Sequence, residues 1–232
     1  MSARVERSFR KVVFSFFYLL TYPLILFLLA GDWHWIEGWM FSGLFCVLSF
    51  LTLLYLFIKD PALLNERFGS PWQKEQKRWD KFLLSSFFLG FLLWFVIMPL
   101  DARRFRWTPE FPLWLKILGA VLLVVAFLIL FAALKENTFA APVIKMQKER
   151  GQKVISTGLY GVVRHPMYLG GTLLFLAGPL LLGSVFGLYM GLLLMVLLAV
   201  RSIGEEEMLK QELEGYREYM SKVRWRILPF VF

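Results

Sequence analysis

Two polar segments in the second half of the chain contain the residue types that could do chemistry. The first, residues 135–171, includes Arg164-His165-Pro166. Proline suits the first turn of a helix, where its missing N–H would be unpaired in any case. His165 is therefore expected at the helix cap, beside free backbone N–H groups and the positive end of the helix dipole. Such a helix start can bind a polar or anionic ligand group.

The second polar segment, residues 201–232, predicts an amphipathic helix. Apolar side chains recur at three- to four-residue spacing at Leu209, Leu213, Tyr216, Met220 and Val223. At ~100° per residue, Glu205 lies roughly 40° and Glu206 roughly 60° from the centre of this stripe, whereas Glu207 lies about 160° away. We therefore expect Glu205 and Glu206 to border the buried face and Glu207 to be solvated. Arg201, one turn before Glu205, is within pairing distance if the helix continues through Gly204.

Two interpretations of these residues stay open from spacing alone. They could form a polar pocket beside the start of the predicted helix at Pro166. Alternatively, Arg164 extends to the membrane interface, His165 only caps its helix and the glutamates form a solvated face. Neither interpretation needs a metal. Cys46 is the single cysteine and lies in an apolar block, which excludes a disulfide framework and a cysteine-based metal site.

The elements that must position these segments are membrane spans. The chain has 232 residues, of which 58% are hydrophobic, and they occur in blocks of roughly twenty, the length that crosses a ~30 Å hydrocarbon core. This pattern excludes a soluble enzyme, a nucleic-acid-binding module and a disulfide scaffold.

The blocks cover 11–30, 36–58, 82–100, 113–134 and 167–200. The last is too long for one crossing, and Pro179 and Gly183–Ser184 predict a hairpin. We therefore expect an all-α integral membrane bundle of about six transmembrane helices, followed by the amphipathic cytosolic helix.

The net charge of +9 is explained by orientation. With both termini cytoplasmic, 22 of the 26 basic residues lie on the cytoplasmic side, as the positive-inside rule requires. We therefore predict a multi-pass protein with both termini and both polar segments at the cytoplasmic face, and no nucleic-acid partner. Charged residues are almost absent within the spans, which gives little support to a channel or transporter.

One motif carries a family resemblance. The stretch GLYGVVRHPMYLG, residues 158–170, resembles the signature of the isoprenylcysteine carboxyl methyltransferase family and its phospholipid N-methyltransferase relatives. ENTFAAPVI, residues 136–144, is similar to the bacterial branch. The second polar segment is also similar to this family. The matching residues are Arg201, Glu205, Glu206, Leu209, Tyr216, Tyr219, Val223 and Ile227-Leu228-Pro229.

The resemblance covers roughly residues 136–232, and the first three spans carry no motif that matches. It therefore divides the chain into an N-terminal transmembrane region, 1–112, and a methyltransferase-like core, 113–232. The cofactor-binding segments of that core would be 136–171 and 201–232. The bacterial character implies a bacterial inner membrane.

The resemblance implies a methyltransferase that uses S-adenosyl-L-methionine and needs no metal. Five residues would line the cofactor: Tyr160, Val163, His165, Tyr168 and Leu169. Glu205 or Glu206 would hold its amino or ribose hydroxyl groups. The implied catalytic residues are Arg164, Arg201 and Glu206, with the two arginines on the substrate side.

The resemblance leaves several acceptors open, all of them lipophilic molecules that enter from the bilayer. The closest match implies carboxyl O-methylation of an isoprenylcysteine-like or otherwise prenylated acceptor, whose carboxylate an arginine would orient. A phospholipid or other lipid amine would instead need a glutamate as base. A membrane sterol reductase has a similar C-terminal pattern, but the run Glu205–Glu207 is a poor neighbour for the extra phosphate of NADPH.

Overall fold

The computed structural model describes residues 3–70, 72 and 76–232, and these residues fold as helices joined by loops. Within this part of the chain no strands form, apart from one isolated bridge between Val163 and Trp225. The basic residue Lys74, one of those that predicted the orientation, lies outside the described residues. The all-α prediction is confirmed.

Within the described residues, four helices are long and apolar enough to cross a membrane. They are α2 (Ile36–Lys59), α4 (Arg78–Pro99) with its π-helical continuation η1 (Leu100–Arg104), α5 (Leu113–Glu136) and α7 (Val185–Glu212). Two further helices, α1 (Ala3–Ala30) and α6 (Pro166–Leu182), contain shorter apolar stretches, Phe17–Ala30 and Pro166–Leu182. All six predicted spans therefore correspond to helices, whereas six complete crossings remain a prediction.

The apolar surface of the helices faces outward. In the most apolar 18-residue stretch of each long helix, only 17% to 33% is buried inside the protein. Large side chains such as Phe88, Leu92 and Val196 are exposed on the outer faces of α4 and α7. Exposed apolar surface of this extent is typical of a membrane-embedded protein, because lipid and not water covers it.

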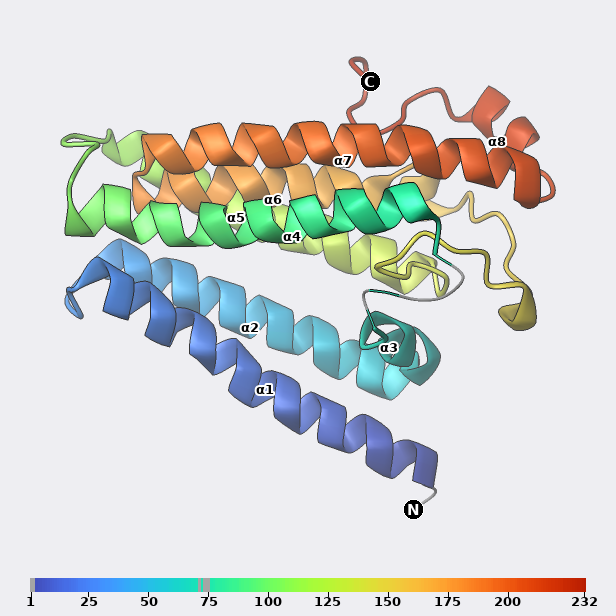
Figure 1. Cartoon of the computed structure of the whole chain (residues 1–232), viewed down its shortest axis with the longest axis horizontal. Coiled ribbons are helices and arrows are strands. Elements are labelled where there is room, and N and C mark those ends of the chain that lie inside the picture. The colour runs from blue at the N-terminus through green and yellow to red at the C-terminus, as the bar shows by residue number, and fades with distance from the viewer. Residues whose placement is uncertain (1–2, 71, 73–75) are drawn as a thin grey trace.

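Helices α6 and α7 form the predicted hairpin. Gly183 ends α6 with a φ of 80°, a backbone conformation that glycine adopts without steric cost, and the hydroxyl of Ser184 caps α7 by accepting from the N–H of Gly187. A Cβ at Gly191 would lie 2.4 Å from the carbonyl oxygen of Phe175, so only glycine lets α6 and α7 approach this closely. The hairpin packs against α4 and α5, while α1 and α2 lie side by side next to this group (Figure 1).

The two ends of the bundle differ (Figure 1). One end, here called the turn end, consists of the connections 31–35, 105–112 and 183–184. The other, the loop end, holds α3 (Pro61–Arg67), the segment 137–165, α8 (Tyr216–Lys222) and the start of α1. The segment 137–165 contains two 3₁₀ turns, η2 (Lys148–Arg150) and η3 (Gly158–Gly161). Both polar segments identified in the sequence lie at the loop end.

The single amphipathic helix predicted beyond residue 201 is replaced by parts of two helices. Helix α7 continues from the hairpin to Glu212, and α8 begins only after Gly215, whose φ of 77° interrupts the helix. The predicted apolar stripe still packs together, because Leu209, Tyr216 and Val223 join one buried cluster around Ile144. The stripe was correctly identified, but the continuity of the helix was not.

Candidate functional site

A cavity of about 350 Å³ lies at the loop end, between the segment 137–155 and helices α4, α6 and α7. Its lining combines polar and apolar side chains. The polar part of the lining includes Arg67, Asn137, Tyr160, His165, Tyr168, Arg201 and Glu205. The apolar part includes Leu84, Phe87, Gly171, Phe175 and Leu198 from the spans, and Phe139, Pro142, Val143 and Ile144 from the segment 137–155. The cavity can therefore accommodate a ligand with a polar and an apolar portion.

His165 caps α6, as predicted, with Pro166 at the first helical position. The imidazole ring is stacked with the ring of Tyr168, at 5.2 Å between centroids and 8° between planes. The Tyr168 hydroxyl donates to Glu205 Oε2 at 2.7 Å, and His165 Nδ1 lies 3.6 Å from the same oxygen. These contacts orient the partly exposed carboxylate of Glu205 at the cavity surface.

The C-terminal segment fixes the position of His165. The backbone N–H groups of Arg164 and His165 donate to the carbonyl oxygens of Trp225 and Arg226, at 2.9 and 2.8 Å. The two polar segments are thus joined directly at the start of α6, although about sixty residues separate them along the chain.

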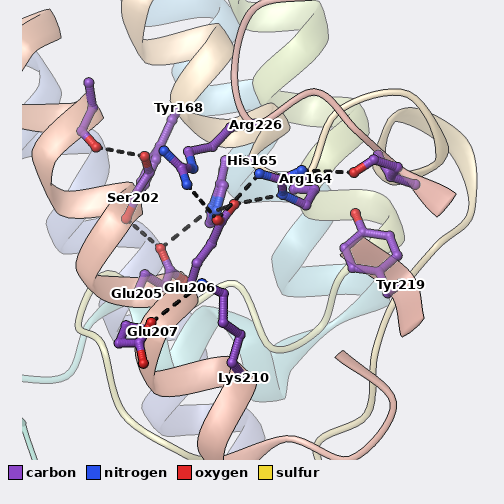
Figure 2. A network of polar contacts seen from close by, with 12 residues as sticks. Arg164, His165, Tyr168, Ser202, Glu205, Glu206, Glu207, Lys210, Tyr219 and Arg226 are labelled. Carbon is purple, nitrogen blue, oxygen red and sulfur yellow. Dashed lines mark hydrogen bonds and ion pairs between the residues drawn. The ribbon is translucent and has the colours of Figure 1, made fainter. Parts of the chain in front are cut away.

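Glu206 lies behind the cavity and not in its lining. Its side chain is 1% exposed and contacts three basic side chains (Figure 2). Oε1 accepts from Arg164 Nε at 2.7 Å and lies 3.1 Å from His165 Nε2, while Oε2 accepts from Arg226 Nη2 at 2.9 Å. The carboxylate is therefore already satisfied by the protein itself.

Glu207 points into solvent, as the helical-face argument predicted. Its side chain is 61% exposed and pairs with Lys210 one turn further along α7. Figure 2 shows this pair outside the group formed by Glu206 and its partners. The three consecutive glutamates thus have three environments: the cavity for Glu205, the buried cluster for Glu206 and solvent for Glu207.

Arg164 is held by more than Glu206. Its Nη1 donates to the carbonyl oxygens of Val223 and Arg224, at 2.8 and 2.6 Å. The side chain is buried, so the alternative in which Arg164 extends to the interface is wrong. Its contacts instead connect α6, α7 and the segment after α8.

Arg201 pairs with a residue that the sequence analysis did not identify. Its Nε donates to Asp80 Oδ1 at 2.8 Å, and its Nη2 donates to the carbonyl oxygen of Pro142 at 2.8 Å. The guanidinium lies over the Tyr168 ring, 6.0 Å from its centroid. Among the described residues, no ion pair joins Arg201 to Glu205, the partner expected from sequence.

Asp80 comes from α4, in the region where no motif was found. It is fully buried and also accepts from Gln76 Nε2 at 2.7 Å and from the Ile144 N–H at 3.1 Å. It therefore joins α4, α7 and the segment that lines the cavity. A carboxylate in the first turn of an apolar helix is a signal that could have identified it, because a buried charge needs a partner.

Tyr160, in η3, lines the cavity and is tied to α8, because the Tyr219 hydroxyl donates to its carbonyl oxygen at 2.7 Å. Burial raises the pKa of the Tyr160 phenol, with the nearby Glu205 adding to the shift, so the hydroxyl stays protonated. Val163, 1% exposed in the bridge to Trp225, and Leu169 do not line the cavity.

The structure thus brings together in the cavity lining six of the nine residues predicted to form the site. They are Tyr160, Arg164, His165, Tyr168, Arg201 and Glu205. The roles assigned to all nine remain predictions. In the part of the chain that the structure describes, no group of three or more His, Cys, Asp or Glu side chains is placed to hold a metal ion.

Comparison with known families agrees with the motif. A family model described as phospholipid methyltransferase matches residues 114–214, which comprise most of α5, the cavity-lining segment, α6 and α7. This match confirms the resemblance to the isoprenylcysteine and phospholipid methyltransferases and indicates a membrane methyltransferase. No curated protein matches the chain. Asp80, Arg67 and Arg226 lie outside the matched segment.

Proposed function

We propose that the protein transfers a methyl group from S-adenosylmethionine to a lipophilic acceptor in the cavity at the loop end. The observation that carries this proposal is the mixed polar and apolar cavity lining, most of which comes from the family-matched segment. A polar cofactor fits the polar residues His165, Tyr168 and Glu205, and a lipid-like acceptor fits the apolar side chains of Leu84, Phe87 and Phe175. The volume of about 350 Å³ lies in the range of small-molecule sites, roughly 300–1,000 Å³.

The polar residues suit the chemistry of this cofactor. S-adenosylmethionine supplies a methyl group on a positively charged sulfur, which is transferred by in-line displacement without a metal. Glu205, oriented by the Tyr168 hydroxyl, can accept hydrogen bonds from an amino group or from ribose hydroxyls. The stacked rings of His165 and Tyr168 offer a flat surface beside it. Holding the reactants in line is the main contribution of such a site.

We assign Arg164, Arg201 and Glu206 to positioning and not to direct chemistry. Glu206 and Arg164 fix the start of α6, and with it the His165 ring. Arg201, held by Asp80, lies over Tyr168 and orients it. Of the two glutamates that the resemblance left open for cofactor binding, Glu205 and Glu206, this proposal assigns Glu205.

Carboxyl O-methylation of an isoprenylcysteine-like acceptor is the reaction we favour. A carboxylate oxygen forms a bond to the methyl carbon while the carbon–sulfur bond breaks, and the sulfur keeps the electron pair. The acceptor loses its negative charge and the sulfur its positive charge, so no proton has to move. The apolar side chains of the cavity lining favour this step, because they reduce the hydration of the attacking carboxylate.

N-methylation of a lipid amine is a second candidate, favoured by the partial exposure of Glu205 at the cavity. An amine must lose a proton, and Glu205 is a carboxylate that can accept it. An NADPH-dependent reductase is less favoured, since the same carboxylate would repel the additional phosphate of that nucleotide.

We also propose that the loop end faces the cytoplasm of a bacterial cell. The start of α1, α3 and α8 share this end, and most of the basic residues counted from sequence belong to it (Figure 1). A soluble cofactor would then reach the cavity from the cytoplasm, and the acceptor would come from the bilayer.

Ligand-induced thermal stabilisation of the purified protein tests the proposal. We expect S-adenosylhomocysteine to raise the melting midpoint and NADPH to leave it unchanged; stabilisation by NADPH alone would refute a methyltransferase. His165→Ala and Glu205→Gln should each weaken the shift, while the matched variant Glu207→Gln should retain it. Transfer of a labelled methyl group to an S-prenylated cysteine acid or to phosphatidylethanolamine then distinguishes the two acceptors.

A further inference from the structure

Arg67, the last residue of α3, differs from the other guanidinium groups in the cavity lining. Arg164 is paired with Glu206 and Arg201 with Asp80. Lys145, also in the lining, is paired with Glu66 at 3.0 Å. Arg67 donates one hydrogen bond, from Nη1 to the carbonyl oxygen of Ala140 at 3.1 Å, and has no carboxylate partner among the described residues.

The unsatisfied capacity of this side chain is large. A guanidinium has five N–H donors in a fixed planar arrangement, and the contact with Ala140 uses one of them. The side chain is half-buried, and its polar neighbours in the lining, Asn137 and Tyr160, are neutral. A cation in this position gains most from a carboxylate that binds it through two parallel hydrogen bonds.

We propose that Arg67 is an anion-binding residue of the cavity and takes the carboxylate of a bound ligand. The inference rests on the proposed function, which supplies two such carboxylates: that of the lipophilic acceptor and that of the amino-acid portion of the cofactor. Because α3 lies outside the family-matched residues 114–214, the N-terminal region would add a ligand contact to the matched core.

For the acceptor, this contact would also distinguish the substrate acid from the product ester by affinity. A carboxylate held by the Arg67 guanidinium carries a negative charge until its oxygen forms the bond to the methyl carbon. The resulting ester is neutral, and its hydrogen bonds to the guanidinium are no longer charge-assisted. Arg67 would therefore bind the acid more tightly than the ester.

The experiment compares ligands with and without the carboxylate, using the full chain purified in detergent. For the cofactor, the pair is S-adenosylhomocysteine and 5′-methylthioadenosine, which shares the nucleoside thioether but lacks the amino-acid portion. For the acceptor, the pair is an N-acetylated S-farnesyl cysteine and its methyl ester. The variants are Arg67→Met, Arg67→Lys, which keeps the charge, and Lys222→Met, which removes an exposed charge at the same end of the bundle but outside the cavity lining.

We expect Arg67→Met to weaken binding of the carboxylate member of one pair on the order of tenfold to a hundredfold. Binding of the member without the carboxylate should change little. Arg67→Lys should lose less, and Lys222→Met should bind as the wild type does. A loss confined to S-adenosylhomocysteine assigns the cofactor carboxylate, and a loss confined to the farnesyl acid assigns the acceptor carboxylate.

Equal binding of both pairs by wild type and Arg67→Met would overturn the inference while leaving the methyltransferase proposal intact. So would an equal loss in Lys222→Met, because the effect would then be one of general charge. If the wild-type protein binds neither S-adenosylhomocysteine nor methylthioadenosine, the proposed function itself fails. Thermal unfolding without ligand identifies any variant that loses its fold, and Arg67→Lys then carries the comparison.

Discussion

Helix α4 and its continuation η1 carry a fully buried aspartate at each end of the bundle, and the two are held differently. At the loop end, Asp80 pairs with the guanidinium of Arg201. At the turn end, the donors to Asp101 among the described residues are all neutral. These are the Ser184 hydroxyl at 2.6 Å, the hydroxyl and N–H of Thr108 at 2.9 Å, and the Phe186 N–H at 3.1 Å.

The two aspartates therefore have different roles. Asp101 holds the turn end together, whereas Asp80 supports residues that line the cavity. Asp101 lies at the first turn of α7, where free N–H groups and the helix dipole stabilise a negative charge. All of its contacts stay within the turn end. The partner of Asp80, by contrast, lines the cavity and lies over Tyr168. Disturbing Asp101 should thus affect stability alone, whereas disturbing the loop-end carboxylates should affect stability and binding.

The largest effect is expected for Glu206→Gln. Removing this carboxylate leaves Arg164, Arg226 and His165 without their shared buried partner. Breaking a buried ion pair by removing one partner costs about 3–5 kcal/mol. Denaturant unfolding in detergent measures this loss in the free energy of unfolding. Glu205→Gln, one residue away, is the control and should lose far less; equal losses would contradict the distinction drawn between them.

Asp80→Asn should have the next largest effect. It replaces a charge-assisted hydrogen bond to Arg201, of a kind that contributes about 1.5–3 kcal/mol. Because Arg201 would no longer be held over Tyr168, the affinity for S-adenosylhomocysteine should fall as well. Titration calorimetry of the variant checks this second effect, and an unchanged affinity would show that Asp80 acts on stability only.

Asp101→Asn provides the matched test at the other end of the bundle. The amide oxygen keeps part of the hydrogen bonding but leaves at least one buried donor unsatisfied, at a cost of about 1–3 kcal/mol. We expect the melting midpoint to fall while the dissociation constant for S-adenosylhomocysteine stays unchanged. A weakened dissociation constant would mean that the two ends are coupled through α7.

The smallest effect is expected for Glu207→Gln. Its pair with Lys210 is exposed, and substitutions at such surface sites usually change stability by within about 0.5 kcal/mol. Both the unfolding free energy and the ligand affinity should match those of the wild type. A measurable loss in either would show that the solvated face of α7 contributes to the site.

The features that sequence predicts well depend on neighbouring residues in the chain. Apolar block lengths located the helices, and the Arg-His-Pro sequence located the start of α6. Helical periodicity separated Glu207 from Glu205 and Glu206. Each of these follows from geometry within a single helix, which the spacing of residue types encodes.

The missed features depend on contacts between distant segments. Asp80 and Arg201 are 121 residues apart in the sequence. The side chains of Arg164 and Arg226 are joined by the carboxylate of Glu206, which accepts a hydrogen bond from each. Counting Lys and Arg for topology assigned Arg226 and Arg67 to a side of the membrane without identifying a partner. The end of α7 at Glu212 was missed as well, because apolar spacing continues across Gly215 even though the backbone turns there.

The continuity of α7 has a mechanical consequence. Its 28 residues form one rod roughly 42 Å long, which exceeds the ~30 Å hydrocarbon core and carries Glu205 near its far end. A helix longer than its bilayer tilts to match the thickness of the membrane, and a rigid rod transmits that tilt along its whole length. We therefore expect the affinity for S-adenosylhomocysteine to differ between nanodiscs made from short-chain and long-chain lipids. Identical affinities in both would show that the cavity is insulated from bilayer thickness.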